Sequence, residues 1–242
     1  FFTYVSTNYN KPHYLINFLY VITNIIFCQY TFVIKGIDFS VIMCYNYKKL
    51  KGGVKMKYIE LDKICYIINK GKSVVKNDNG NIYMVGFTNI ENNAINFEKT
   101  SKCNLVNAYM DLKIYDIEEN DILLPPITRK NLVIKQLLTL ENSNNMIYSS
   151  RAVYIRVNQE KYLSQFLYYI LSTQKYKEKL LKEVYTDGSY VDTYQISIER
   201  LKDFKVPDIS IEEQKNILNS ENKIKTQIQE LENQLKLLYK NL

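Results

Sequence analysis

The stretch LKDFKVPDISIEEQKNI, residues 201–217, decides how this chain is divided. Pro207 has no backbone N–H group and disfavours helix in the residue before it, so the apolar run that precedes it has to end there. Ser210 stands three residues before Glu213, which is the spacing of a capping box, and the acidic residues around it suit the positive end of a helix dipole. The stretch therefore predicts that one domain closes near Pro207 and that a helix begins directly after it.

Beyond this start, apolar side chains recur in alternating steps of four and three residues. This apolar stripe comprises Ile217, Ile224, Ile228, Leu231, Leu235, Leu238 and Leu242, with Glu221 as a polar interruption. The spacing is the a/d heptad pattern of a coiled coil, and the segment contains neither Gly nor Pro. We expect a helix over residues 211–242, about 48 Å long at 1.5 Å per residue, that pairs with a counterpart helix. The alternative is a helix that folds back on its own domain, for which a wider apolar face is typical.

Residues 56–207 contain apolar runs of strand length that are separated by short polar turns. The runs cover residues 64–68, 82–87, 112–117, 121–127, 131–140 and 152–157. Between residues 161 and 184 the spacing becomes helical, for one helix or for two if Ser172-Thr173 interrupts it. A polar turn around Gly188 then leads to a further short helix or strand. We expect an α+β fold, with packed helices on a β-rich domain of residues 56–207 and the long helix in residues 208–242.

The residues offer no constellation for catalysis. The one histidine is His13, so residues 56–242 hold no side chain for a histidine-based triad or general base. The cysteines, at positions 28, 44, 65 and 103, form no CxxC pair, and neither a Walker A loop nor a GxGxxG motif occurs. We therefore expect no catalytic residue, no metal ligand and no cofactor in this chain, and a reducing cytoplasmic environment.

Net charge is a weak guide to the partner. The formal charge of +7 is concentrated in residues 1–55, which carry six lysines and a single acidic residue, Asp38. Residues 56–242 carry 26 basic and 24 acidic residues, so this part of the chain is close to neutral. Such a balance supports nucleic-acid binding only weakly.

Residues 1–55 raise a separate question. Lys51-Gly52-Gly53 back-translates to AAA-GGA-GGT, a bacterial ribosome-binding sequence, and stands just ahead of Met56. The hypothesis is that residues 1–55 are a conceptual translation of AT-rich DNA upstream of a start at Met56. The alternative is a membrane segment, because residues 14–34 carry no charged side chain and are long enough to span a bilayer. Polar residues such as Asn24 and Gln29 interrupt that segment and count against a membrane anchor.

Over residues 56–242 the chain resembles the specificity subunits of type I restriction-modification enzymes. The most specific match lies in residues 196–217, where a short apolar run, a proline and a Glu-Gln helix opening follow one another. The matching positions are Leu201, Val206, Pro207, Ile211, Glu213, Gln214 and Ile217. The opening YIELDKICYIINKGKS, the segment NDILLPPI and Gly188-Ser189 support the resemblance, whereas Ile209 replaces a second proline that the family often has.

The resemblance implies a target recognition domain that reads a few base pairs of double-stranded DNA, and a helical arm that sets its distance from a second such domain. Full-length members carry two recognition domains and two helices, so this chain is similar to a half-subunit that forms a homodimer, or to a fragment. The implied partners are DNA methyltransferase subunits and a restriction and translocase subunit, in a bacterial cytoplasmic complex. Those separate subunits would hold S-adenosylmethionine, ATP and Mg²⁺.

Candidate DNA contacts are basic, amide or hydroxyl side chains in turns that flank the strands. They are Lys70, Lys72, Ser73, Asn89, Arg129, Lys130, Lys135, Arg151, Ser189 and Tyr190. Arginine and asparagine can read guanine and adenine edges, while lysine mainly neutralises phosphate. The candidate contacts of the helix with its counterpart are Ile217, Ile224, Ile228, Leu231, Leu235 and Leu238.

Two other classes of function stay open. A helical interaction or adaptor protein would use the same long helix without reading DNA, and the near-neutral domain permits it. A stand-alone nuclease or methyltransferase would need an active site that the motifs above do not provide.

Overall fold

The structure of the protein is a computed structural model, which describes residues 56–104, 116–140, 145–188 and 190–240. Lys55–Leu242 form one compact unit. The hypotheses on residues 1–55 lie outside the described residues, as do Ser189, Leu242 and most of the strand expected at residues 112–117.

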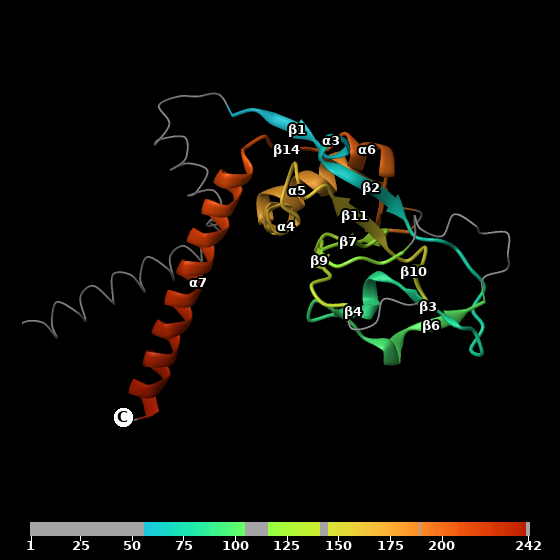
Figure 1. The fold of residues 1–242 in the computed structure, drawn as a ribbon, viewed down its shortest axis with the longest axis horizontal. Coiled ribbons are helices and arrows are strands. Elements are labelled where there is room, and N and C mark those ends of the chain that lie inside the picture. The colour runs from blue at the N-terminus through green and yellow to red at the C-terminus, as the bar shows by residue number, and fades with distance from the viewer. Residues whose placement is uncertain (1–55, 105–115, 141–144, 189, 241–242) are drawn as a thin grey trace, which may run out of the picture. The chain divides into compact units, whose positions relative to one another are not determined.

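The described part is a mixed α+β domain followed by a long helix (Figure 1). Its central sheet has the strand order β2-β11-β7-β9, and each neighbouring pair is antiparallel. The bounds are β2 (Cys65–Lys70), β11 (Val153–Val157), β7 (Ile122–Leu124) and β9 (Lys135–Gln136). Val153 lies opposite Lys70 on one side and Leu124 on the other, so β2 and β7 end where β11 begins.

Smaller sheets extend the central one. In the second sheet β10 (Met146–Tyr148) pairs in parallel with β3 (Ile82–Val85), and β3 pairs antiparallel with β6 (Ser101–Cys103). The third sheet has the order β12-β13-β8, with β12 (Tyr185–Asp187), β13 (Tyr194–Ile196) and β8 (Ile127–Thr128). The remaining elements here are the hairpin of β4 (Ile90–Glu91) and β5 (Ala94–Ile95) and two single 3-10 turns, η1 (Phe87–Asn89) and η2 (Phe97–Lys99).

The described residues of the domain form four short helices: α3 (Leu61–Ile64), α4 (Ser164–Ser172), α5 (Gln174–Glu183) and α6 (Ile198–Lys202). The helical stretch expected at residues 161–184 is a pair of helices that is broken at Thr173. Thr173 has extended backbone, and its side chain accepts a hydrogen bond from the Tyr176 N–H, so it caps α5. Of the two alternatives that the sequence left open, the structure therefore has the pair of helices.

The two ends of the domain are joined by a small antiparallel ladder. β1 (Tyr58–Glu60) pairs with β14 (Lys205–Pro207), with Ile59 opposite Val206. The Leu61 N–H donates to the Phe204 carbonyl at 3.0 Å, and the Asp208 N–H donates to the Lys57 carbonyl at 3.0 Å. β14 ends at Pro207, as the missing N–H of proline predicts.

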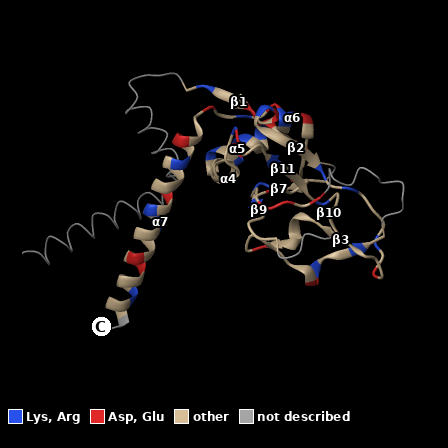
Figure 2. Cartoon of the chain, viewed as in Figure 1, with Lys and Arg blue, Asp and Glu red and all other residues tan. Residues whose placement is uncertain are grey.

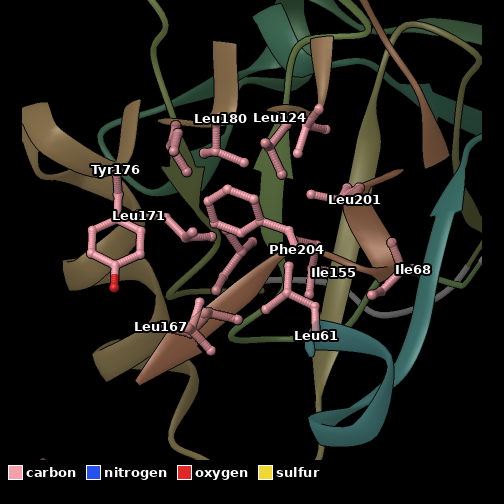
Figure 3. Close-up of a cluster of buried hydrophobic side chains, with 14 of the residues drawn as sticks. Leu61, Ile68, Leu124, Ile155, Leu167, Leu171, Tyr176, Leu180, Leu201 and Phe204 are labelled. Carbon is pink, nitrogen blue, oxygen red and sulfur yellow. The ribbon is translucent and has the colours of Figure 1, made fainter. Parts of the chain in front are cut away.

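The main core lies between the central sheet and the helices. Figure 3 shows the Phe204 ring among side chains of β7, β11, α4 and α5, including Leu124, Ile155, Leu171 and Leu180. Phe204 is 2% exposed, and burying a phenylalanine of this kind contributes about 1.5–3 kcal/mol. The residues just before Pro207 therefore anchor the end of the domain in its core.

A second core fills the other face of the central sheet. It comprises Val85, Ile90, Ile117, Leu123, Leu137, Met146, Tyr148, Ala152 and Tyr154. The rings of Tyr148 and Tyr154 stack with centroids 4.5 Å apart. Successive residues of β7 and β11 thus serve opposite cores, because a sheet that is covered on both faces needs apolar side chains at every position.

An ion-pair network is buried at the edge of the second core. The Arg156 guanidinium donates to both carboxylate oxygens of Asp121, at 2.9 and 2.8 Å, and to Glu118 at 2.8 Å. Asp121 also accepts from the Tyr148 hydroxyl at 3.1 Å, and its own exposure is 1%. Burial raises the pKa of Asp121, while Arg156 acts in the opposite direction. Because the carboxylate is matched by several donors, the network ties β11 to the turn that precedes β7.

The strand expected over residues 131–140 is much shorter in the structure, where only Lys135–Gln136 pair with β7. Leu132 and Ile134 are buried in the main core and Leu137 in the second core. The segment is apolar because it packs against both cores, and that requirement does not need a continuous strand.

The long helix α7 (Ile211–Lys240) starts where the capping box predicts. The Glu213 N–H donates to Ser210 Oγ at 3.3 Å, and the Ser210 N–H donates to Glu213 Oε2 at 3.3 Å. Gln214 is fully buried, and its side chain accepts from the Leu163 N–H at 2.8 Å and donates to the Ile209 carbonyl at 2.9 Å. These hydrogen bonds therefore anchor the first turns of α7 to the domain.

Past these turns α7 continues for several more turns, and Figure 2 shows its charged residues spaced along it between uncharged stretches. Its 30 residues correspond to about 45 Å at 1.5 Å per residue. Within the described residues, no helix combines the length and the apolar character that crossing a membrane requires.

Replacing Arg156 by methionine should lower the free energy of unfolding of the purified chain by about 3–5 kcal/mol, because the buried Asp121 carboxylate loses its counter-charge. Urea unfolding followed by circular dichroism measures this. The matched control is Lys76→Met, which breaks the exposed ion pair with Asp78 and should cost less than about 1 kcal/mol. Equal losses for the two variants would contradict the structural role assigned to the buried network.

Candidate nucleic-acid interface

A turn of two serines and an arginine, residues 149–151, joins β10 to β11 and lies at the centre of the candidate site. The Ser149 N–H donates to the Val85 carbonyl at 2.9 Å, and the Ser150 N–H donates to the Lys72 carbonyl at 2.8 Å. This serine turn is thereby held between the chain that leaves β2 and the chain that leaves β3.

Two glycines make this approach possible. A Cβ atom at Gly71 would collide with the carbonyl oxygens of Tyr148 and Ser149. A Cβ atom at Gly86 would meet Arg151 Cβ at 3.2 Å and Ser149 Oγ at 3.3 Å. Only a residue without a side chain fits at Gly71, so the three segments pack backbone against backbone.

The side chains around the serine turn suit contact with a polyanion. Lys70, Ser73 and Arg151 are exposed, and Lys72 is half-buried. These four candidates, expected from the sequence to contact DNA, are brought together with the hydroxyl groups of Ser149 and Ser150. Whether they contact DNA stays a prediction.

Asn89 and Lys135 lie next to this group, but their polar atoms are used within the domain. Asn89 accepts from the Gly86 N–H at 2.7 Å and donates to the Lys99 carbonyl at 2.7 Å. Lys135 Nζ donates to the carbonyls of Phe87 at 3.1 Å and Ile90 at 2.6 Å, and burial lowers its pKa. Both side chains brace the turn after β3, and whether either of them contacts DNA stays a prediction.

A second group lies at the end of the β12-β13-β8 sheet. Thr128 of β8 pairs with Tyr194 of β13 in an antiparallel register, so the exposed Arg129 and Lys130 continue beside the residues that precede Tyr194. Tyr190 is 78% exposed in that connection. Arg129, Lys130 and Tyr190 therefore lie at the same end of this sheet, whereas Ser189 lies outside the described residues.

Pro125-Pro126 connects the two groups. β7 ends at Leu124, in the row of the central sheet that also contains Lys70 and Val153. The Tyr185 hydroxyl donates to the Pro125 carbonyl at 2.8 Å, and the Ile196 N–H donates to the Pro126 carbonyl at 3.0 Å. Both groups of candidate side chains thus belong to segments that leave the same end of the central sheet.

The expected contacts of the long helix divide into two kinds. Ile217 packs against the main core of its own domain. Ile224, Ile228 and Leu231 are half-buried, while Leu235 and Leu238 are 38% and 63% exposed. A pairing of α7 with another helix stays a prediction.

Sequence reasoning missed Ser149 and Ser150. It did not expect β10, whose three residues are too few to show a periodicity, and so the turn after β10 was not recognised as a connection between strands. The signal that could have found it is Ser-Ser-Arg directly before the apolar run of β11. Among the described residues, no three His, Cys, Asp or Glu side chains come together as potential metal ligands.

Solved structures show what this fold is. The HsdS subunit from Thermoanaerobacter tengcongensis is 14% identical, with a TM-score of 0.53 over 89% of this chain and 50% of that chain. A chain from a study of complex assembly and conformational transition of the type I R-M system is 14% identical, with a TM-score of 0.51 over 90% of this chain and 52% of that chain. The S subunit of a type I system from M. genitalium also matches, at 12% identity and a TM-score of 0.42 over 75% and 42% of the two chains.

The chain therefore has the fold of a type I restriction-modification specificity subunit, and it spans about half the length of the solved structures that it matches. No family model and no curated protein sequence matches it.

The variant Gly71→Ala should displace the serine turn, because the new methyl group would overlap the carbonyl oxygens of Tyr148 and Ser149. We expect a loss of about 1–3 kcal/mol in the free energy of unfolding, together with amide chemical-shift changes at Ser149–Arg151 in NMR spectra. The exposed neighbour Ser73→Ala is the control and should change the stability by less than about 0.5 kcal/mol. An alanine that left both the stability and the shifts unchanged would contradict the close packing described here.

Proposed function

We propose that this chain is the sequence-specific DNA recognition subunit of a type I restriction-modification enzyme, in a form with one recognition domain. The observation that carries the proposal is the convergence of basic and hydroxyl side chains at one end of the central sheet, in a fold shared with specificity subunits. The domain of residues 56–207 is the reader of a few base pairs of double-stranded DNA, and residues 208–242 are its spacer and dimerisation arm.

The side chains around the serine turn and at the end of the β12-β13-β8 sheet can take different roles in DNA binding. Arg151 and Arg129 are exposed and can donate two hydrogen bonds to a guanine edge, and the Ser149 and Ser150 hydroxyls can donate to or accept from any base. Lys70, Lys72 and Lys130 neutralise phosphates and fix the register of the domain on the duplex. The serine turn is held by backbone hydrogen bonds on both sides, so little freedom is lost when it contacts DNA.

In this proposal the chain itself is not catalytic. It directs DNA methyltransferase subunits, and a restriction and translocase subunit, to the site that it recognises. S-adenosylmethionine, ATP and Mg²⁺ belong to those subunits, and the complex works in the bacterial cytoplasm.

The helix α7 pairs with the α7 helix of a second copy, and its charges favour an antiparallel arrangement. In that arrangement Ile224 lies opposite the partner's Leu235 and Ile228 opposite the partner's Leu231. Lys225 directly follows Ile224 and Glu232 directly follows Leu231, so both occupy e positions of the heptad pattern. An antiparallel pair brings Lys225 of each helix beside Glu232 of the partner helix. A parallel pair would instead place Glu221 against its own copy.

Such an arm acts as a ruler. A helix of about 45 Å spans roughly 13 base pairs at 3.4 Å per pair. Two recognition domains at this fixed separation would read two short half-sites as one site. Two half-sites with a fixed spacer give selectivity that a single head with few base contacts cannot reach.

An adaptor protein without a DNA-reading role is the second candidate, and the near-neutral charge of residues 56–242 is the observation in its favour. Co-expression with a type I methyltransferase subunit, followed by a DNA-binding assay, separates the two. An adaptor would retain no DNA in a sequence-selective way.

In the assembled complex, Arg151→Ala should relax the preference at one base position and lower selective affinity by about 1–3 kcal/mol. Lys72→Ala should weaken binding to all sequences alike and reduce the dependence of log K on log salt by about one. Arg129→Ala should likewise change affinity or preference. Lys63→Ala, in α3 at the other end of β2, is the control that should leave binding unchanged. If all four variants bind DNA equally, the serine turn does not take part in sequence recognition.

Glu232→Lys should weaken dimerisation about thirtyfold, because each of two interhelical ion pairs changes from an attraction of about 0.5 kcal/mol to a repulsion of similar size, which is about 2 kcal/mol in total. Adding Lys225→Glu should restore the dimer, and sedimentation equilibrium measures both effects. The matched control is Glu230→Lys, the same substitution on the outer face of the helix. If Glu230→Lys and Glu232→Lys weaken the dimer equally, the antiparallel arrangement is wrong.

A further inference from the structure

Two large apolar side chains stand in solvent at the tip between β12 and β13. Tyr190 is 78% exposed and Val191 is 92% exposed, which makes them among the most exposed apolar side chains of the described residues. We call this pair the apolar tip. An aromatic and a β-branched residue side by side in water have no stabilising role in the domain itself, since neither is packed against the cores.

Hydrogen bonds of the described residues restrain the backbone around the apolar tip. The Gly188 N–H donates to the Thr193 carbonyl at 2.7 Å, and the Thr193 N–H and hydroxyl both donate to the Tyr190 carbonyl, at 3.2 and 2.7 Å. Asp192 takes a left-handed conformation with φ of 58°, which turns the chain back toward β13. These bonds restrain the residues on either side of Tyr190 and Val191, which reduces the backbone entropy lost when the tip inserts into a partner.

Charges around the apolar tip nearly cancel. Arg129 and Lys130 continue from β8 beside it, and Asp187 and Asp192 lie in the hairpin itself. Two basic and two acidic side chains give this surface little net charge, so electrostatic attraction to phosphates is weak here and a contact with DNA would depend on the apolar atoms. Lys130 can then neutralise a phosphate beside an inserted wedge, which agrees with the role proposed for it above.

We infer that the apolar tip is a wedge that inserts Tyr190 and Val191 between two stacked base pairs of the bound duplex. This inference rests on the proposed function and deepens it, because it adds a readout that needs no hydrogen bond to a base edge. Apolar wedges of this kind partly unstack a base step and kink the duplex. Pyrimidine–purine steps such as TA and CA are the easiest to kink, so the tip selects such a step in the half-site by its deformability.

The test uses the assembled complex with a methyltransferase subunit and a duplex that contains its selected site. Two readouts report the wedge: the bend angle from fluorescence resonance energy transfer between the duplex ends, and the fluorescence of 2-aminopurine at each step of the half-site. The variant Tyr190→Ala with Val191→Ser should abolish the bend and the 2-aminopurine signal and weaken selective binding about tenfold or more. Both residues are exposed, so the domain should fold as before.

Two comparisons sharpen this result. The variant Tyr190→Phe with Val191→Ile keeps an apolar wedge and should retain bend, signal and affinity, which a hydrogen bond from the Tyr190 hydroxyl would not allow. The variant Tyr66→Ala with Val133→Ser removes one exposed aromatic and one exposed aliphatic side chain elsewhere, at 65% and 51% exposure, and should change nothing.

Failure of the inference and failure of the proposed function look different. A wild-type complex that selects no DNA sequence contradicts the proposed function. A complex that selects its site while the duplex stays straight, with the Tyr190→Ala and Val191→Ser variant binding as well as wild type, overturns the wedge alone. Loss of the methyltransferase subunit from that variant would make the tip a protein contact and would also overturn the wedge.

Discussion

The pairing of β1 with β14 is the constraint on which the rest of this structure depends. It joins the first described strand to the last one, and the backbone hydrogen bonds from Leu61 to Phe204 and from Asp208 to Lys57 extend it on both sides. Phe204 enters the main core one residue before the ladder, and Pro207 ends the ladder. The capping box and the buried Gln214 then fix where α7 begins. The helix thus leaves the domain from a defined point and not from a loose linker.

The central sheet connects this closure to the candidate interface. β2 begins beside α3, next to β1, and the Asn158 N–H at the end of β11 donates to the Ile64 carbonyl at 2.9 Å. The other ends of these two strands carry Lys70 and the serine turn. Every residue of β7 and β11 is buried, so the middle of the sheet between the two ends is closely packed. The domain thus holds the turns that carry the candidate DNA contacts in a fixed relation to the start of α7, which is what the proposed spacer role requires.

The parts of the fold that sequence could predict are those with strong local signals. Pro207, the capping box at Ser210 and Glu213, and the interruption at Thr173 each act through backbone groups within a few residues, and all three are present. β10 and the true length of β9 could not be predicted, because both depend on pairing with residues far along the chain. The hydrogen bonds that Asn89 and Lys135 make within the domain could not be predicted from the sequence either. A polar residue in a turn gives the same sequence signal whether it stabilises the turn or contacts a partner. Arg156 lies within an apolar run, and its partner Asp121 is 35 positions away.

The central claim is that paired α7 helices hold two identical recognition domains at a fixed distance, and that the two domains recognise DNA together. Selection of bound duplexes from a random pool, by the complex assembled with a type I methyltransferase subunit, tests it most directly. The account predicts an inverted repeat of two short half-sites with one fixed spacer, because antiparallel pairing relates the heads by a two-fold axis. Recovery of one contiguous site, or of half-sites at variable spacing, would contradict it.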